Sequence, residues 1–197
     1  MKKVLFILTM LCVAVFSTAC INNVAVEKLN NAAKIYMEKG DYTSAIQRLE
    51  SSLELDKTVY QTYYNLGVAY VESKQYQKAI DALTSAINLN PKYADSYYTL
   101  AIAQEGYADS FVEDNEEGSV PVLSPQNPNV SAKPVDKYKG VSDSTKKEMI
   151  NYYLLAIQNY QLYIDLINSS QKTEGISARI EELQKELKEL GYTESDF

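Results

Sequence analysis

Apolar residues recur at helical spacing along the middle of the chain and mark out short segments. One face of the segment 76–90 consists of Tyr76, Ala79, Ile80, Leu83, Ala86 and Ile87. The preceding segment has its own apolar face, formed by Tyr63, Leu66, Gly67 and Tyr70. A polar stretch at 73–75 separates the two segments, and Pro91 follows where a helix must stop. The pattern therefore predicts two helices joined by a short turn.

The same pattern occurs twice at an interval of 34 residues. Residues identical to those 34 positions later are Tyr42, Ala45, Ile46, Leu49 and Leu55. A fixed period of this length indicates stacked helix hairpins. Glycine inside a helix costs about 1 kcal/mol relative to alanine. We therefore expect Gly67, together with Ala79, to lie where two helices approach closely, with Tyr63 and Tyr70 on either side.

This pattern resembles the tetratricopeptide repeat (TPR), which has an aromatic residue, Leu-Gly, Tyr, Ala, an aliphatic residue, Ala and Pro at set offsets. Residues 60–93 match every class. Residues 26–59 match more loosely, with Leu29, Ala33 and Lys57 at the aromatic, glycine and proline positions. The resemblance implies an all-α solenoid of about three helix hairpins, the first at 26–59 and the second at 60–93.

The third repeat is interrupted. Its first helix is predicted at 94–109, where YYTLAIA echoes YYNLGVA, and its second at 143–169, where Ala156 takes the place of Ala79. The segment 110–142 between them starts acidic and holds four of the five prolines, which exclude a helix. It is either a solvated loop or a functional lid or second binding surface. The acidic start lacks the ligand spacing of a calcium loop, and no metal site is predicted.

A last amphipathic helix is predicted at 173–191. Its narrow apolar seam consists of Ile176, Ile180, Leu183, Leu187 and Leu190, and Gly191 is placed to end it. Stacked repeats need a terminal element with a polar outer face, so we expect a capping helix. The seam is too short to predict a coiled-coil dimer, and the oligomeric state stays open.

Residues 1–19 have the layout of a signal peptide. A basic start precedes an apolar run at 4–16, which is shorter than the roughly 20 residues of a transmembrane helix. The cysteine at position 12 leaves with this segment, so the exported chain begins with its single cysteine, Cys20. A lone thiol in an oxidising compartment is a liability unless it is used.

The sequence STAC at 17–20 resembles the lipobox of bacterial lipoproteins, with Thr18, Ala19 and Cys20 fitting and Ser17 where leucine is usual. The resemblance implies that Cys20 is acylated, for instance with palmitate, and that residues 20–25 form a short lipidated tether. The protein would then be exported and held on a bacterial membrane by its lipid chains. Without acylation of Cys20 it would be secreted in soluble form.

Composition narrows the function further. The 26 acidic residues outnumber the 19 basic ones, and the net charge of −7 disfavours nucleic acid as a partner. The chain has no histidine, which removes the commonest general base and zinc ligand. We therefore predict a protein without catalytic residues or cofactors.

In TPR proteins the first helices of the repeats line a concave groove that binds other proteins. On this register the candidate groove residues are Asn30, Lys34, Met37, Tyr64, Asn65, Val68, Val71, Tyr98 and Ile102. Some TPR domains clamp a carboxylate with lysine and asparagine, but here Asn30 and Lys34 exchange those positions, and Asp95 and Thr99 replace two basic residues.

What remains is an apolar trough rich in tyrosine, suited to an apolar or aromatic segment of a protein in the cell envelope. TPR lipoproteins of this kind serve assembly or scaffold roles. Two alternatives stay open: Tyr64 and Tyr98 pack against each other across adjacent repeats, or exposed tyrosines stack on a glycan.

Overall fold

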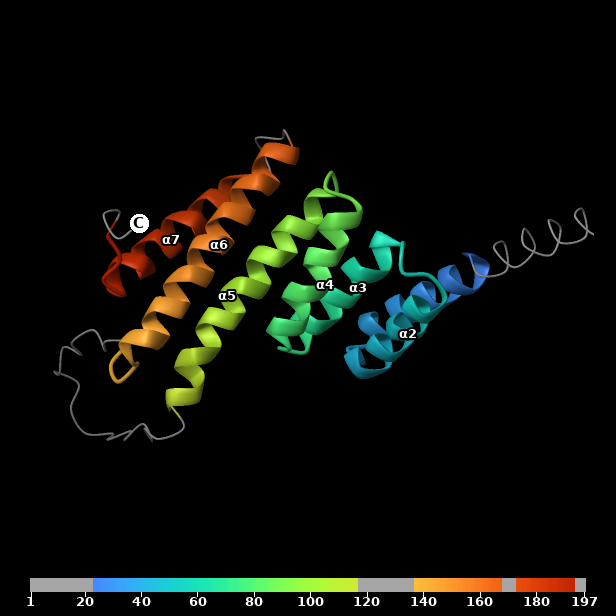
Figure 1. Ribbon diagram of the computed structural model, residues 1–197, viewed down its shortest axis with the longest axis horizontal. Helices are drawn as coiled ribbons and strands as arrows, with labels where there is room; N and C mark the ends of the chain where they lie inside the picture. The colour runs from blue at the N-terminus through green and yellow to red at the C-terminus, as the bar shows by residue number, and fades with distance from the viewer. Residues whose placement is uncertain (1–22, 117–136, 168–172, 194–197) are drawn as a thin grey trace, which may run out of the picture. The chain divides into compact units, whose positions relative to one another are not determined.

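The computed structural model describes residues 23–116, 137–167 and 173–193, and every regular element in these ranges is a helix (Figure 1). A first helix covers residues 23–38 and is followed by α2 (Tyr42–Leu55), α3 (Tyr60–Glu72), α4 (Tyr76–Leu89), α5 (Ala94–Glu116), α6 (Asp143–Ile167) and α7 (Glu174–Glu189). The chain divides into two compact units, residues 1–96 and residues 97–197. The all-α fold is as expected.

Several predictions concern residues that the structure does not describe. The signal peptide at 1–19, the lipid site at Cys20 and the central part of the insert, 117–136, lie outside the described ranges. Residues 23–25, which were predicted to belong to a tether, are helical. No helix within the described ranges combines the length and the apolar character needed to cross a membrane.

In the first unit the turn between the two helices of a hairpin is built identically in both repeats. The backbone N–H groups of Gly40 and Lys74, 34 residues apart, each donate over 2.9 Å to the carbonyl three residues earlier. The next N–H groups, of Asp41 and Gln75, donate to the carbonyl five residues earlier. Gly40 and Lys74 are both left-handed, with φ of 73° and 56°. This motif ends a helix, and it explains why the period of 34 extends to the turns.

The helices of the first unit approach closely at Gly67, as its position in the repeat predicts. A Cβ atom built on Gly67 of α3 would overlap the side chain of Leu83 of α4, at 2.7 Å from Cδ2. Leu83 and Ala79 are fully buried. The neighbour that requires the glycine is therefore Leu83, one turn beyond the expected Ala79.

The second unit consists of the greater part of α5 with α6 and α7, which lie side by side (Figure 1). A buried hydrogen bond of 2.9 Å from Asn159 Nδ2 to Gln104 Oε1 joins α6 to α5. The seam of α7 is turned inward, with Ile176, Leu183 and Leu187 buried, and α7 packs along α6. This use of the seam inside the unit agrees with a capping helix.

Helix α5 is longer than predicted. It continues to Glu116, so the predicted end of the first helix of the third repeat, at 109, was wrong. The extra turns have an apolar side: the ring of Phe111 packs edge-on against Tyr107 at 5.1 Å, and Val112 is buried. The segment 110–142 thus begins as a continuation of the helix.

The chain returns from the insert through a fixed turn at 137–140. Tyr138 is buried and donates a 2.8 Å hydrogen bond to Glu186 of α7, while Lys137 Nζ bridges Glu186 at 2.9 Å and Asp109 of α5 at 3.2 Å. Burial opposes the charge of Glu186, but these hydrogen bonds outweigh it and lower the pKa of Glu186 below its usual value. The return point is therefore tied to two helices.

Helix α6 then starts at Asp143. The side chain that caps it is that of the preceding residue, Ser142, whose Oγ accepts a 3.2 Å hydrogen bond from the N–H of Thr145.

Candidate binding site

Two of the predicted groove residues belong to the interior of the first unit. Asn30 Nδ2 lies 2.9 Å from both Ser52 Oγ of α2 and Thr62 Oγ1 of α3, and 3.0 Å from its own helix at the carbonyl of Val26. Asn65 donates to Asn30 Oδ1 over 3.3 Å. All four polar side chains are buried. The prediction that Asn30 and Asn65 face a ligand is therefore wrong, because both asparagines satisfy buried hydroxyl and amide groups of neighbouring helices.

The other groove candidates of the first unit reach the surface to different extents. Lys34 is exposed, whereas Met37, Val68 and Val71 are half-buried. Tyr64 is also half-buried, and its ring meets that of Tyr93 edge-to-face at 5.0 Å. Tyr64 thus has a packing partner inside its own unit.

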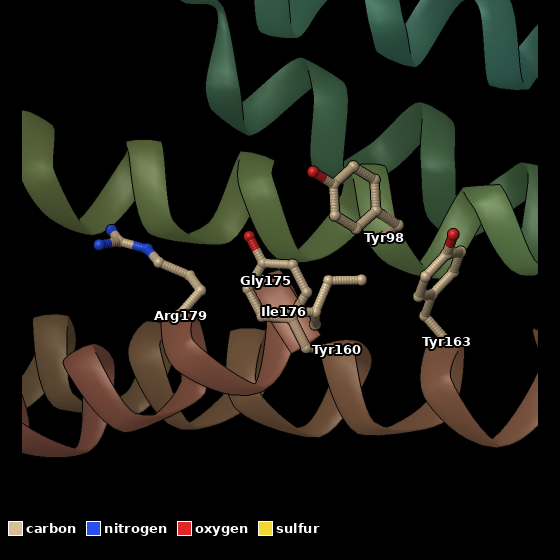
Figure 2. Close-up of a pocket in the computed structure, with 6 residues that line it drawn as sticks. All are labelled: Tyr98, Tyr160, Tyr163, Gly175, Ile176 and Arg179. Carbon is tan, nitrogen blue, oxygen red and sulfur yellow. The ribbon is translucent and has the colours of Figure 1, made fainter. Parts of the chain in front are cut away.

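A deeper site lies in the second unit, where a cleft of about 580 Å³ opens between its helices. Its lining comes from all three helices: Tyr98 of α5, Tyr160 and Tyr163 of α6, and Gly175, Ile176 and Arg179 of α7. Figure 2 shows Arg179 at one end of this row and Tyr163 at the other, with Tyr160 and Ile176 between them. Of the predicted groove residues, Tyr98 lies in this cleft. Ile102, one turn further along α5, is half-buried and does not line it.

The three tyrosine rings of the cleft pack on one another. The ring of Tyr98 lies 5.8 Å from that of Tyr160 and 5.2 Å from that of Tyr163, tilted by 59° and 43°. Tyr160 and Tyr163 are buried, but Tyr98 is 37% exposed. One aromatic face is therefore held in place by two buried rings and still offered to a ligand.

The wall beside the rings contains a paired arginine. Arg179 binds Glu105 Oε2 of α5 through Nε at 2.8 Å and Nη2 at 2.6 Å, and binds Glu182 through Nη1 at 2.8 Å. Burial alone would lower the pKa of Arg179, but the hydrogen bonds to Glu105 and Glu182 raise it, so the guanidinium stays charged. Burial and the nearby Glu105 carboxylate raise the pKa of Tyr160, which keeps its hydroxyl neutral.

Most of this cleft was missed from the sequence. Ile176 was assigned to the seam of the capping helix, and the other lining residues of α6 and α7 fall within predicted helices but were given no binding role. Alignment of Tyr160 with Leu83 of the second repeat was the one available signal, because a tyrosine at a leucine position needs room for its hydroxyl. Within the described ranges, no three acidic or cysteine residues lie close enough to hold a metal ion.

Comparison with known proteins supports the assignment of helix hairpins. Residues 24–92 match the tetratricopeptide repeat family, whereas no curated protein matches the chain significantly. Among solved structures, the first TPR domain of Spaghetti (RPAP3) bound to the HSP90 peptide SRMEEVD has a TM-score of 0.56 at 14% identity, covering 82% of this chain and 92% of that one. The first TPR domain of human RPAP3 also has a TM-score of 0.56, at 13% identity, covering 87% and 97%. At these identities the likeness shows the fold, and it confirms the predicted TPR architecture.

Proposed function

We propose that this chain, whose residues 24–92 match the tetratricopeptide repeat family, is a membrane-anchored interaction module that holds a segment of a protein partner in its tyrosine cleft. The fold is that of a protein-binding module. The proposed anchor is a lipid on Cys20, which places the module in the cell envelope of a bacterium in an assembly or scaffold role. The proposal assigns it no catalytic residue.

The observation that carries the proposal is the exposed ring of Tyr98 over two buried rings. An aromatic side chain that is already ordered loses little conformational entropy on binding, which is why tyrosines are frequent anchors of interfaces. The cleft is large enough for one or two side chains of a peptide at about 580 Å³. Tyr98 also belongs to the first helix of its repeat, the helix that the TPR resemblance assigns to the groove.

A glycan suits this cleft less well. Sugar rings stack flat on open aromatic faces, but Tyr160 and Tyr163 are buried and tilted against Tyr98. One exposed ring is left for stacking.

The binding role can be tested by photocrosslinking in cells. A photoreactive phenylalanine analogue in place of Tyr98 should form a crosslink to a discrete partner. The same analogue in place of Leu162 is the control, since Leu162 is 39% exposed on α6 and does not line the cleft. Equal crosslinking from both positions, or none from position 98, would count against the cleft as the binding site.

The anchor requires a separate test. Membrane fractionation of the wild-type protein and of Cys20→Ser should place the wild-type protein with the membrane and the variant in the soluble fraction. A variant that stays in the membrane fraction after a salt wash would show that the thiol is not the attachment point.

A further inference from the structure

The acidic charge of this protein is concentrated in its second half. Residues 1–96 contain 9 acidic and 10 basic residues, whereas residues 97–197 contain 17 acidic and 9 basic ones. The first half is thus close to neutral, and the second half accounts for the negative net charge. A field of one sign around a binding cleft selects partners of the opposite sign.

Acidic groups also outnumber basic groups among the described residues at the wall of the cleft. Among the described residues that line the cleft, Arg179 is the one cation, and it is already paired with two carboxylates, those of Glu105 and Glu182. Glu105 is more than nine-tenths buried, and its second oxygen, Oε1, has no hydrogen-bond partner in the described part of the chain. A further carboxylate, the exposed Glu174, precedes Gly175 in the wall. Within the part of the chain that the structure describes, three carboxylates at or beside this wall therefore outnumber the one guanidinium, and the balance is negative.

We propose that the tyrosine cleft binds a protein segment that carries lysine or arginine next to an aromatic or large apolar side chain. This inference rests on the proposed function and names the chemistry of its partner. The apolar side chain would pack against Tyr98 and Ile176. The cationic group would lie beside the ring of Tyr98 and face the carboxylates of Glu174 and Glu182.

An acidic segment has the wrong charge for this wall. A carboxylate could reach Arg179 only by competing with two carboxylates that are already bonded to it, and it would meet their repulsion. The TPR domain of Spaghetti is bound to the peptide SRMEEVD, which has acidic residues near its end. The cleft described here should prefer the opposite charge.

Three synthetic peptides separate the possibilities: Gly-Ser-Lys-Tyr-Phe-Lys-Ser-Gly and the two peptides with glutamate or glutamine in place of both lysines. Binding of each labelled peptide to the full chain is measured by fluorescence anisotropy at low and high salt. The lysine peptide should bind at least about fivefold more tightly than the glutamate peptide, since two exposed charge pairs turn from attractive to repulsive. The glutamine peptide should fall between them, and high salt should shrink the differences.

Variants locate the effect on the protein. Glu174→Gln and Glu182→Gln should each weaken binding of the lysine peptide by roughly two- to fivefold. Glu181→Gln removes the same charge from an exposed position one residue before Glu182. Adjacent residues point about 100° apart around a helix, so this variant should leave the affinity almost unchanged.

The outcomes distinguish the inference from the function on which it rests. If the glutamate or glutamine peptide binds best and Tyr98→Ala abolishes that binding, the cleft is a binding site but its preference for basic segments is refuted. If Glu181→Gln weakens the lysine peptide as much as Glu182→Gln does, attraction is general and the proposed pairing at the wall is refuted. If no peptide shows binding that depends on Tyr98, the inference and the cleft as the binding site fall together.

Discussion

Replacement of Gly67 by alanine should destabilise the protein, although alanine is the better helix former. Gly67 lies inside α3, and α4 crosses it at Leu83. The new Cβ atom would stand 2.7 Å from Leu83 Cδ2 and 3.2 Å from Cδ1, and closer still to Cγ. The contact with Cγ decides the outcome, because the branch point of a leucine moves only with the whole side chain.

The size of the effect follows from two opposing contributions. Alanine in place of glycine inside a helix is worth about 1 kcal/mol of helix stability. An extra methyl group in a well-packed interior costs about 1–3 kcal/mol through strained rotamers and backbone shifts. Leu83 is fully buried, and protein interiors are close-packed, so we expect the upper part of that range to apply. We expect a net loss of about 1–2 kcal/mol in the free energy of unfolding.

A second substitution should reverse the sign of the effect that Gly67→Ala has on the free energy of unfolding. Leu83→Ala alone should cost about 2–5 kcal/mol, because it leaves a cavity where the leucine was. In that background the three atoms nearest to the Cβ atom of alanine at position 67, all of Leu83, are gone, so Gly67→Ala should stabilise the protein by about 1 kcal/mol. Urea unfolding followed by far-ultraviolet circular dichroism measures all four proteins of the cycle.

Measuring Gly67→Ala in both the wild-type protein and the Leu83→Ala variant tests whether Leu83 is the cause of the effect. If Gly67→Ala stabilises the wild-type protein, Leu83 does not restrict the site and the close approach of α3 and α4 is not the reason for the glycine. If the substitution destabilises both backgrounds equally, its cost comes from somewhere other than the contact with Leu83.

Four further predictions concern the interior, one turn and the titrating groups. Asn30→Ala should lower the free energy of unfolding by about 2–4 kcal/mol, because it strands buried polar partners, whereas Asn31→Ala on the exposed side should change it by less than about 0.5 kcal/mol in the same urea titration. Lys74→Gly should raise the melting temperature, because a left-handed backbone with φ of 56° costs a lysine about 1 kcal/mol, and an unchanged or lower value would contradict this. The lowered pKa of Glu186 means that its stabilisation is complete above its ordinary pKa of 4.5 and is lost as the pH falls through the lowered value, so Glu186→Gln should show a weaker loss of stability on acidification. Burial and a hydrogen bond to a glutamate raise the pKa of Tyr70 to about 12, so its stabilisation should be complete below pH 10 and be lost towards pH 12, and Tyr70→Phe should weaken that alkaline loss.

The fold was predictable because the same packing contacts recur every 34 residues in a stacked repeat. The turn residues Gly40 and Lys74 occupy equivalent positions because the two hairpins are built alike. The residue pattern of one hairpin therefore predicts the structure of the next. The end of α5 was not predictable in the same way. The third repeat has no intact counterpart to compare with, and the apolar side that carries the helix on through Phe111 and Val112 stands directly before the acidic stretch.

The sequence also failed to predict which way the polar side chains of the first helices point. A helical register places Asn30 and Asn65 on a face, but it does not tell whether that face meets water or the hydroxyl of another helix. Ser52 of α2 and Thr62 of α3 are the partners of Asn30, and Asn30 in turn accepts a hydrogen bond from Asn65. A buried network of this kind depends on matches between separate segments, so no local pattern shows it.

The site is found where the repeat stops being regular, and there is a physical reason for this. In the first unit the side chains at repeat positions contact one another. Asn30 binds two buried hydroxyls and accepts from Asn65, Leu83 fills the space at Gly67, and the ring of Tyr64 packs against that of Tyr93. In the second unit Tyr160 takes the position of Leu83, and α7 approaches α5 through the ion pair of Arg179 and Glu105. A larger side chain and a polar contact pack less completely than a leucine against a glycine, and what they leave open is the cleft. A variant that restores regular packing, Tyr160→Leu, should therefore leave the fold intact and remove the support beneath Tyr98, which would weaken partner crosslinking from position 98 without unfolding the protein.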